Sequence, residues 1–339
     1  MRILVYNSSW SNVGNGWFAA SCRNLLRGMY PDSIVQDGDD DIIAAFRPRW
    51  NFEKNNAFPL IQYQRADLHV FTGPILPQCD AAHVFGAKIK DIVAHGEKYC
   101  IISASGTGMK RADQDKVGEI LTAYSPLFIT TRDEESYQWL KPFVRNLYNG
   151  ICTAWLVDRT IQPGTFQLDK PFFISSWYTE LDPVFTLPQG KECTVENLEV
   201  QHKKTYCGLP YNIARHLNFL RPQQKGIGGK AIVRTIQNLN TRFNHINFAM
   251  PQSFISFNVE KYLDVVKSSE FTISDRVHAC VVSLACGHPA RFLFSTPRAG
   301  IFTRMGMDFT KNNGVMYPNM DKVDQEMYML QQEIRKYLG

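Results

Sequence analysis

Residues 270–294, EFTISDRVHACVVSLACGHPARFLF, contain a strand, a helix and a second strand in succession. Residues 270–274, in which polar residues alternate with Phe271 and Ile273, predict a strand, and residues 275–287 predict a helix that ends at Gly287. Residues 289–294 predict the second strand. A helix that joins two strands places them parallel in one sheet, so this segment by itself predicts an α/β fold.

The same alternation of strands and helices extends along the chain. Strands are predicted at 2–6, 66–73, 98–108 with its glycine turn, 126–130, 170–178 and 246–251, and helices at 17–29, 82–96, 111–123, 258–269, 297–306 and 322–338, with one more helix that starts near 132. Repeated strand-then-helix units of this length predict a doubly wound sheet of parallel strands.

The chain has 339 residues, which is longer than a domain with a single hydrophobic core usually is, so two domains are expected. The alternation is lost between about residues 148 and 170, a segment that contains Pro163 and Gly164. We therefore predict two Rossmann-like domains, 1–160 and 170–320, followed by a C-terminal helix at 321–339. Two such domains suggest a GT-B-like arrangement, with ligands bound in an inter-domain cleft at the carboxyl ends of the strands.

The composition indicates a folded protein, because 44% of the residues are hydrophobic and 20% are charged. The eight cysteines form no CxxC pair, so neither a metal site nor a disulfide framework is indicated, and reduced, packed thiols are expected. No stretch approaches the roughly 20 apolar residues of a spanning helix, and no secretory segment is recognisable, which predicts a cytoplasmic location. The net charge is +5, and the basic residues are spread along the chain, so no basic patch for nucleic-acid binding is indicated. This charge is compatible with peripheral membrane association.

The strongest candidate for chemistry lies at the start of the helix after FTIS. Arg276 and His278 occupy its first turn, and Ser274 or Asp275 is placed to cap it. A helix N-terminus favours a bound phosphate or carboxylate, a guanidinium can hold either group, and an imidazole can donate a proton near neutral pH. The structural alternative is a surface pair of Asp275 with Arg276 and a packed His278.

Three further glycine-rich or charged motifs carry weaker signals. NVGNGW, residues 12–17, places Gly14 and Gly16 between a strand and a helix, where the backbone can approach a ligand or simply turn. It is not a GxGxxG sequence, so dinucleotide binding is not indicated. SASGTG and TTRDEES are interpreted mainly as a turn and as a helix cap in which Arg132 and Asp133 are structural.

Four segments, in order, resemble the polysaccharide pyruvyl transferase family. They are NVGN at 12–15, ADLHVFTGPIL at 66–76, LFITTRDEESYQWLK at 127–141, and FTISDRVHACVVSLACGHPARFLF at 271–294. The last is similar to the family's Ser/Thr-Arg-x-His helix followed by Gly-x-Pro and a strand. Position 15 is Asn where the family usually has Asp, and Arg298 stands roughly where a Lys often occurs.

The resemblance implies a transferase that moves an enolpyruvyl unit from phosphoenolpyruvate to a sugar or lipid-linked glycan and forms a pyruvate ketal. It implies no cofactor and no metal, with the acceptor on the first domain and the donor on the second. His278 would be the catalytic acid and Arg276 the catalytic anion clamp. The substrate-binding residues implied are Asn12, Gly14, Asn15, Gly73, Ser274 and Arg298.

Two other functions stay open from the residues. One is a GT-B glycosyltransferase that uses a nucleotide sugar, for which the helix N-terminus would hold a diphosphate. The other is a catalytically silent sugar-binding relative, which Asn15 suggests if an acidic residue there acts as the base in relatives. The acceptor sugar, the base, the oligomeric state and the role of residues 182–244 are not determined by the sequence.

Overall fold

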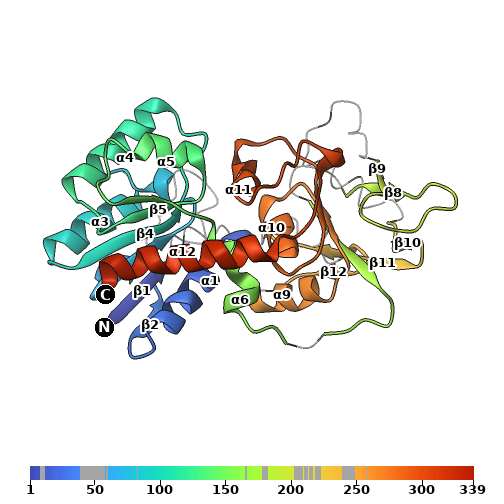
Figure 1. Cartoon of the computed structure of the whole chain (residues 1–339), viewed down its shortest axis with the longest axis horizontal. Helices are drawn as coiled ribbons and strands as arrows, with labels where there is room; N and C mark the ends of the chain where they lie inside the picture. Colours follow the sequence, from blue (N-terminus) through green and yellow to red (C-terminus); the bar gives the residue numbers. More distant parts are fainter. Residues whose placement is uncertain are drawn as a thin grey trace. The chain divides into compact units, whose positions relative to one another are not determined.

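The computed structural model describes residues 1–7, 12–38, 58, 60–81, 83–164, 166–177, 182–201, 209, 213, 217, 223–238, 249–256 and 258–339. They form two compact units. Unit 1 consists of Met1–Ile161, Pro297–Gly306 and Met320–Gly339, and unit 2 of Gln162–Thr296 and Met307–Asn319. Each unit is built on a sheet of mainly parallel strands, as the sequence predicts (Figure 1).

The described sheet of unit 1 has the strand order β2-β1-β3-β4-β5-β6, and every pair of neighbouring strands is parallel. Its strands are β1 (Arg2–Tyr6), β2 (Ile34–Asp37), β3 (Leu68–Thr72), β4 (Lys98–Ala104), β5 (Ile129–Thr131) and β6 (Leu147–Asn149). Nearly all residues of β1, β3 and β4 are buried, which is typical of parallel strands covered by helices on both faces.

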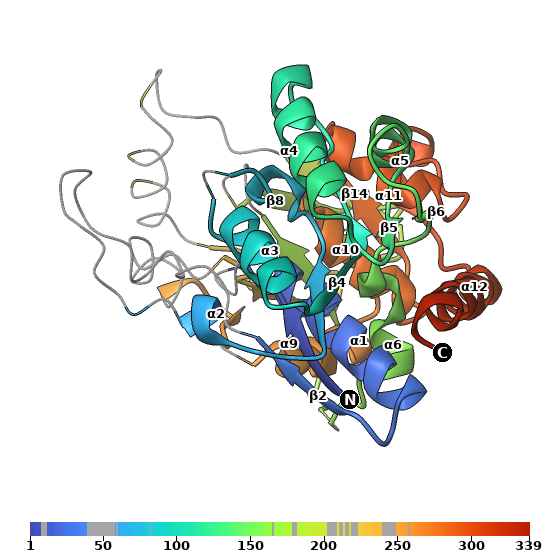
Figure 2. The same ribbon diagram turned by 90° about the vertical axis from the view of Figure 1, so that its left-hand side faces the viewer.

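The helices of unit 1 cover both faces of this sheet. They are α1 (Val13–Met29), α2 (Leu60–Tyr63), α3 (Val84–Ala94), α4 (Arg111–Ala123), α5 (Glu134–Leu140), α6 (Val157–Thr160), α11 (Gly300–Thr303) and α12 (Met320–Leu338), with 3-10 turns at Leu76–Gln78, Thr153–Leu156 and Pro297–Ala299. Phe85, Leu121 and Trp139 place α3, α4 and α5 in one apolar core, and α1 and α12 lie on the other side (Figure 2).

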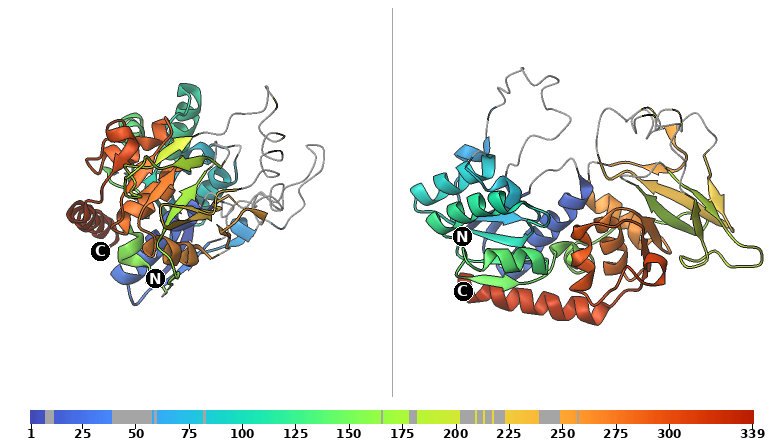
Figure 3. Two further views of the ribbon diagram at one scale, coloured as in Figure 1. Left: turned by 90° about the vertical axis from the view of Figure 1, so that its right-hand side faces the viewer. Right: turned by 90° about the horizontal axis from the view of Figure 1, so that it is seen from above.

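The described sheet of unit 2 has the order β10-β11-β7-β13-β14-β15, with β12 paired to β11. Figure 3 shows the ribbon from two further sides. Only the pairs β10–β11 and β14–β15 are antiparallel. The elements are β7 (Phe172–Ser176), β10 (Gly226–Ile227), β11 (Lys230–Thr235), β12 (Ser253–Phe254), β13 (Thr272–Ser274), β14 (Ala290–Phe292), β15 (Val315–Met316), α9 (Val259–Lys267), α10 (Val277–Ala285), a 3-10 turn at Asn312–Gly314, and a separate antiparallel pair of β8 (Val184–Thr186) and β9 (Glu199–Gln201).

Residues 297–306 belong to unit 1, whereas the sequence predicts them in the second domain at 170–320. The reason is packing: the buried ring of Phe302 meets Trp155 edge-on, with ring centroids 6.4 Å apart. The C-terminal helix also completes unit 1, because Tyr337 stacks on Phe128 at 5.1 Å. The chain therefore leaves unit 2 after β14, adds a piece to unit 1 and returns to unit 2 at 307–319.

Other differences are local. Helix α1 begins at Val13 and not near Trp17, because the Asn12 Oδ1 accepts a hydrogen bond from the Gly14 N–H at 3.1 Å and caps the helix. Strands β2, β6 and β11 are not predicted by the sequence. Of the strand predicted at 246–251, residues 246–248 lie outside the described residues, and the remainder is not a strand.

The state of the cysteines and the character of the helices can be compared with what the sequence predicts. All seven cysteines among the described residues are free, and all but Cys286 are buried, as expected for packed thiols. In the described part of the chain, no helix combines the length and the apolar character needed to cross a membrane.

A buried histidine links β1 to the start of β4 in unit 1. The His69 Nδ1 lies 2.9 Å from the Tyr6 hydroxyl, and its Nε2 lies 2.9 Å from a Glu97 carboxylate oxygen. Burial lowers the pKa of His69, against the opposing effect of the Glu97 hydrogen bond. A neutral imidazole with its proton on Nε2 accepts from Tyr6 and donates to Glu97, so it satisfies both partners.

We predict that this histidine makes folding stability depend on pH. Because its pKa is lower in the folded state, the unfolded chain takes up a proton first as the pH falls below about 6.5. The free energy of unfolding should therefore decrease on acidification through that range, and less so in His69→Gln. Urea unfolding at a series of pH values measures this, and equal pH dependence in the two proteins would contradict it.

Candidate functional site

Hydroxyl groups join the carboxyl ends of three neighbouring strands in unit 2. The Ser274 Oγ at the end of β13 donates to the Ser176 carbonyl oxygen at the end of β7. The Ser176 Oγ in turn donates to the Thr235 carbonyl oxygen at the end of β11, at 2.9 Å. All three residues are buried. This edge is where ligands bind in sheets of this class, so its side chains are the first candidates for a site.

Helix α10 starts at this edge. Its N-cap is Arg276, with φ −98° and ψ 120°, and not Ser274 or Asp275 as the sequence suggests. The Ser274 Oγ accepts a hydrogen bond from the Arg276 N–H at 2.8 Å, which fixes the turn from strand to helix. Asp275 is buried, whereas Arg276 and His278 are half-buried. The structure thus places a cation and an imidazole beside the positive end of a helix dipole.

Tyr262 of α9 lies within electrostatic reach of this cation. Its hydroxyl donates to the Ile236 carbonyl oxygen and accepts from the Ser256 N–H at 3.1 Å. Burial raises the pKa of Tyr262 to about 12, and the positive charge of Arg276 opposes that rise. The phenol therefore stays neutral at physiological pH, so it does not act as a negative counter-charge for Arg276.

In unit 1, the first motif forms the start of α1. The Asn12 carbonyl oxygen accepts from the N–H groups of Asn15 and Gly16, at 2.9 and 3.3 Å. Gly14 and Asn15 are both buried, and Asn15 is 9% exposed. The three predicted substrate-binding residues Asn12, Gly14 and Asn15 are thus brought together at the carboxyl end of β1, and Asn12 has a structural role as the helix cap.

Gly73 has a packing role that the sequence did not reveal. It follows β3 with φ +72°, and a Cβ built there would lie 2.2 Å from the Phe18 ring of α1. Its N–H donates to the Ile102 carbonyl oxygen at 3.1 Å, and its carbonyl oxygen accepts from the Ser105 N–H at 3.2 Å. The glycine is therefore required by the close approach of α1 and by the left-handed backbone.

The carboxyl edge of unit 1 also carries a polar cluster after β4 and β5. The Ser105 Oγ donates to the Asp133 Oδ2, and the Asp133 Oδ1 accepts from the Ser136 N–H, both at 2.8 Å. Asp133 thus caps α5, as the sequence predicts. Its neighbour Arg132 is 5% exposed, with an Nη1 that lies 3.9 Å from the Cys152 sulfur. A cation buried at this edge is a candidate anion-binding group, which the sequence interpretation as a cap missed.

Strain at the end of β4 supports a functional assignment of this cluster. Ser103 is buried and has φ +61°, a costly conformation for a residue other than glycine. Its N–H donates to the Thr130 Oγ1 at 3.0 Å, and its Oγ donates to the Ile151 carbonyl oxygen at 2.8 Å. Strained residues held by their surroundings gather at functional sites. The signal in the sequence was the presence of polar residues after two neighbouring strands, in SASGTG and TTRDEES.

Arg298 is not part of the unit that contains Arg276. It is exposed and lies in the 3-10 turn Pro297–Ala299 of unit 1. The same segment reaches the α5 cap, because a Cβ on Gly300 would lie 3.9 Å from the Asp133 Cβ. Arg304, another arginine of this segment, donates to Glu326 of α12 at 3.0 Å and so has a structural partner.

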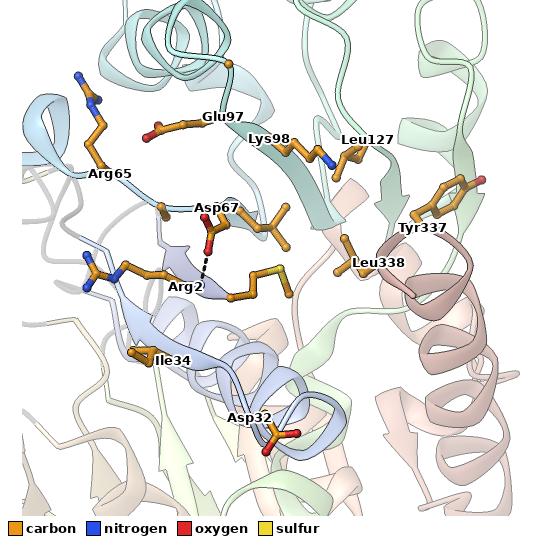
Figure 4. Close-up of a pocket in the computed structure, with 14 residues that line it drawn as sticks. Arg2, Asp32, Ile34, Arg65, Asp67, Glu97, Lys98, Leu127, Tyr337 and Leu338 are labelled. Atoms are coloured by element: carbon orange, nitrogen blue, oxygen red, sulfur yellow. Dashed lines mark hydrogen bonds between the residues drawn. The ribbon is translucent and has the colours of Figure 1, made fainter.

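A pocket of about 850 Å³ lies at the opposite edge of the unit 1 sheet (Figure 4). Its lining includes Arg2, Asp67, Lys98 and Tyr337, and the Arg2 N–H donates to the Asp67 Oδ2 at 2.7 Å. Arg2, Asp67 and Lys98 begin or directly precede strands of this sheet, and Tyr337 lies in α12. The pocket therefore lies away from the carboxyl ends of the strands, where the predicted site residues of unit 1 are. In the described residues, no group of three or more His, Cys, Asp or Glu side chains is arranged to hold a metal ion.

Comparison with known protein families identifies the chain. A family model described as polysaccharide pyruvyl transferase matches residues 12–293. The chain belongs to the polysaccharide pyruvyl transferase family. The match spans Asn12, Gly14, Asn15, Gly73, Ser274, Arg276 and His278, whereas Arg298 lies beyond its end. No curated protein sequence matches this pyruvyl transferase family member.

Solved structures confirm the fold class of this family member. It is similar to the structure of MnaA from S. aureus with UDP, with 11% identity, coverage of 99% of this chain and 89% of that chain, and a TM-score of 0.51. UDP-GlcNAc 2-epimerase from Neisseria meningitidis bound to UDP-GlcNAc has 10% identity, coverage of 99% and 100%, and a TM-score of 0.50. At such low identity the likeness shows the fold alone, which is α/β with two Rossmann-like domains.

We predict that Gly73→Ala destabilises the protein more than Gly96→Ala. Both positions have φ near +70°, so both substitutions carry a backbone cost of about 1–2 kcal/mol. Only Gly73 faces a ring at 2.2 Å, whereas nothing lies within 4 Å of a Cβ at Gly96. Overpacking should add about 1–3 kcal/mol to the loss of unfolding free energy in urea. Equal losses in the two variants would show that the Phe18 contact is unimportant.

Proposed function

We propose that this family member transfers the enolpyruvyl unit of phosphoenolpyruvate to two neighbouring hydroxyls of a sugar and forms a pyruvate ketal. The observation that carries the proposal is the start of α10, where Ser274 positions Arg276 and His278 beside the helix N-terminus. The donor has both a phosphate and a carboxylate, so it needs fixed positive charge. The reaction also needs an acid close to neutral pKa.

The proposed reaction begins with a proton. The methylene carbon of phosphoenolpyruvate accepts it from His278 and becomes a methyl group, which leaves positive charge on the central carbon. One sugar hydroxyl adds to that carbon and loses its proton, and the bond between this carbon and the phosphate oxygen breaks with phosphate as the leaving group. The second hydroxyl then adds to the same carbon and closes the ketal ring. Of the two protons that the hydroxyls lose, one restores His278 to its protonated form and the other leaves with the released phosphate.

Arg276 is proposed to hold an anionic group of the donor. The guanidinium can form two parallel hydrogen bonds to a phosphate or carboxylate, and the N-terminus of α10 adds favourable N–H groups. Phosphate gains negative charge as it leaves, so a fixed cation stabilises the transition state more than the bound donor. Within unit 1, Arg132 is a separate candidate for binding an anionic group, because it is buried at the carboxyl edge of that sheet and lies within the family match.

A second candidate function follows from the fold of the similar structures. MnaA from S. aureus and the Neisseria meningitidis epimerase were solved with UDP and UDP-GlcNAc. A helix N-terminus such as that of α10 can also hold a diphosphate. A sugar-binding relative without catalysis is the third candidate, since Asn15 cannot act as a carboxylate base. The donor assay below separates these three functions.

We expect phosphate release when the protein is incubated with phosphoenolpyruvate and a suitable sugar acceptor. The panel comprises galactosides and acceptors that contain N-acetylmannosamine, with mass spectrometry of the acceptor for the added ketal. A parallel incubation replaces phosphoenolpyruvate with UDP-GlcNAc. Release of UDP with no phosphate from phosphoenolpyruvate would support a glycosyltransferase, and acceptor binding with neither product would support the silent relative.

We predict different kinetic effects for the two residues of α10. His278→Gln should lower kcat about 10²–10⁴-fold with little change in the KM for phosphoenolpyruvate, because a proton donor is lost. Arg276→Gln should raise that KM about 10-fold or more, because a charge-assisted hydrogen bond is lost. His288→Gln is the matched control, since His288 lies just past the other end of α10 and contacts the Lys267 carbonyl oxygen. If His278→Gln retained the kcat of this control, His278 would not be the acid.

A further inference from the structure

Unit 2 contains a pocket of about 520 Å³ that is separate from the start of α10. Its lining includes Lys191, Glu196, Asn197, Glu199, Arg291 and Asn313. This volume lies within the range of about 300–1,000 Å³ that is usual for small-molecule sites. Most of the lining comes from the segment around β9, whose role the sequence did not determine.

Arg291 is the buried charge of this pocket. It lies in the middle of β14 and is 4% exposed. Its Nε donates to the Asn313 carbonyl oxygen at 2.9 Å, and its Nη1 donates to the Leu198 carbonyl oxygen. Both partners are neutral, and no carboxylate of the described residues forms an ion pair with it. Burial lowers the pKa of Arg291, with no acidic neighbour that opposes this shift.

A second buried arginine on the same sheet shows the usual arrangement. Arg234 of β11 is 1% exposed, and its Nε donates to an Asp182 carboxylate oxygen at 3.0 Å. Its other nitrogens donate to the carbonyl oxygens of Pro251 and Gln224, at 3.0 and 2.7 Å. Arg234 therefore has two carbonyl partners, as Arg291 has, and a carboxylate in addition. A buried charge is costly unless it is compensated, so Arg291 lacks the compensation that its counterpart has.

The two carboxylates that line the pocket are held by other groups. Glu196 accepts a hydrogen bond from the Tyr317 hydroxyl, and Glu199 accepts one from the Thr186 hydroxyl at 3.2 Å. Burial acts to raise the pKa of Glu196, but hydrogen bonds from Tyr317, Thr194 and the backbone together lower it, and no basic group contributes to that shift. These acids thus line the pocket without neutralising Arg291.

The pocket is distinct from the site at the start of α10. Arg291 is paired with Ile273 of β13 and Val315 of β15 in the sheet, so the three side chains share one face. Ile273 and Val315 pack in an apolar cluster with Phe185 and Leu198, which belong to the segment around β8 and β9. That cluster contains no described residue of α10. Arg291 therefore projects toward the β8–β9 side of the sheet.

We propose that this pocket binds the carboxylate or phosphate of a small saccharide, with Arg291 as the anion-binding residue. The anion supplies the counter-charge for Arg291 that no carboxylate of the described residues supplies through an ion pair. Exposed Lys191 adds a second positive charge at the rim, and Asn197, Glu196 and Glu199 present polar groups to the sugar hydroxyls. The site is independent of the proposed transferase chemistry and needs no turnover to be observed.

Calorimetric titration of the full chain tests this site. The probes are D-glucuronate, D-glucose 6-phosphate, inorganic phosphate and neutral D-glucose at constant ionic strength. The titrations use the Arg276→Gln background, which removes the cation at the start of α10. The three anions should bind and D-glucose should not. Phosphate that binds as tightly as D-glucose 6-phosphate identifies a free-anion site, whereas tighter binding of the sugar phosphate identifies a saccharide site.

Variants at Arg291 decide the assignment. Adding Arg291→Gln should weaken binding of the anions at least about 10-fold, and Arg291→Lys should retain part of it, because the charge is kept. Lys225→Met, an exposed lysine of unit 2 outside this pocket, is the control and should not change binding. Unchanged anion binding in Arg291→Gln, or equal binding of D-glucose and D-glucuronate, would overturn the proposal.

A further variant keeps the test decisive if Arg291→Gln does not fold. Lys191 is exposed, so Lys191→Met should fold as the wild type does. It should weaken anion binding a few-fold, as expected for the loss of one exposed charge at the rim. Equal binding by Lys191→Met and Lys225→Met, or the absence of binding by any anion, would also overturn the proposal.

Discussion

The hydroxyl of Ser274 sets the geometry of the candidate site in unit 2. It donates to the Ser176 carbonyl oxygen and accepts from the Arg276 N–H, so one side chain ties β13 to β7 and fixes the residue at which α10 begins. The N-terminus of α10 therefore lies at the carboxyl edge of the sheet. Arg276 and His278 follow at positions that this bond determines.

The buried arginines Arg234 and Arg291 differ in whether a carboxylate of the described residues compensates their charge. We use this difference to distinguish an arginine with a structural role from one proposed to bind a ligand. Arg234 is buried with Asp182 as its counter-ion, which suits a residue that holds its own unit together. Arg291 is buried against neutral carbonyl groups in the wall of a pocket. Burial of charge is costly, so a site that leaves compensation to a ligand gains affinity for anions at some expense of stability.

The sequence predicted many helices, strands and caps correctly, but it did not predict which unit a segment joins or which charged side chains are buried. The predicted β13–α10–β14 unit, the helix 111–123 and the Asp133 cap are present, because strand periodicity and capping are local properties. Residues 297–306 were placed in the wrong domain, since a ring contact between Phe302 and Trp155 has no signature in either segment. Arg132 was interpreted as part of a cap because its burial depends on several distant segments.

The sequence by itself determined the α/β class, the family, and the order of strand, Arg276 and His278, because apolar periodicity and short motifs are written in neighbouring residues. The tertiary structure alone decided that Arg298 belongs to unit 1, that Gly73 is a glycine because of Phe18, and that Arg291 has no acidic partner among the residues that the structure describes. Each of these depends on which atoms of distant segments meet. Burial and charge compensation are properties of that packing, and the order of residues does not specify them.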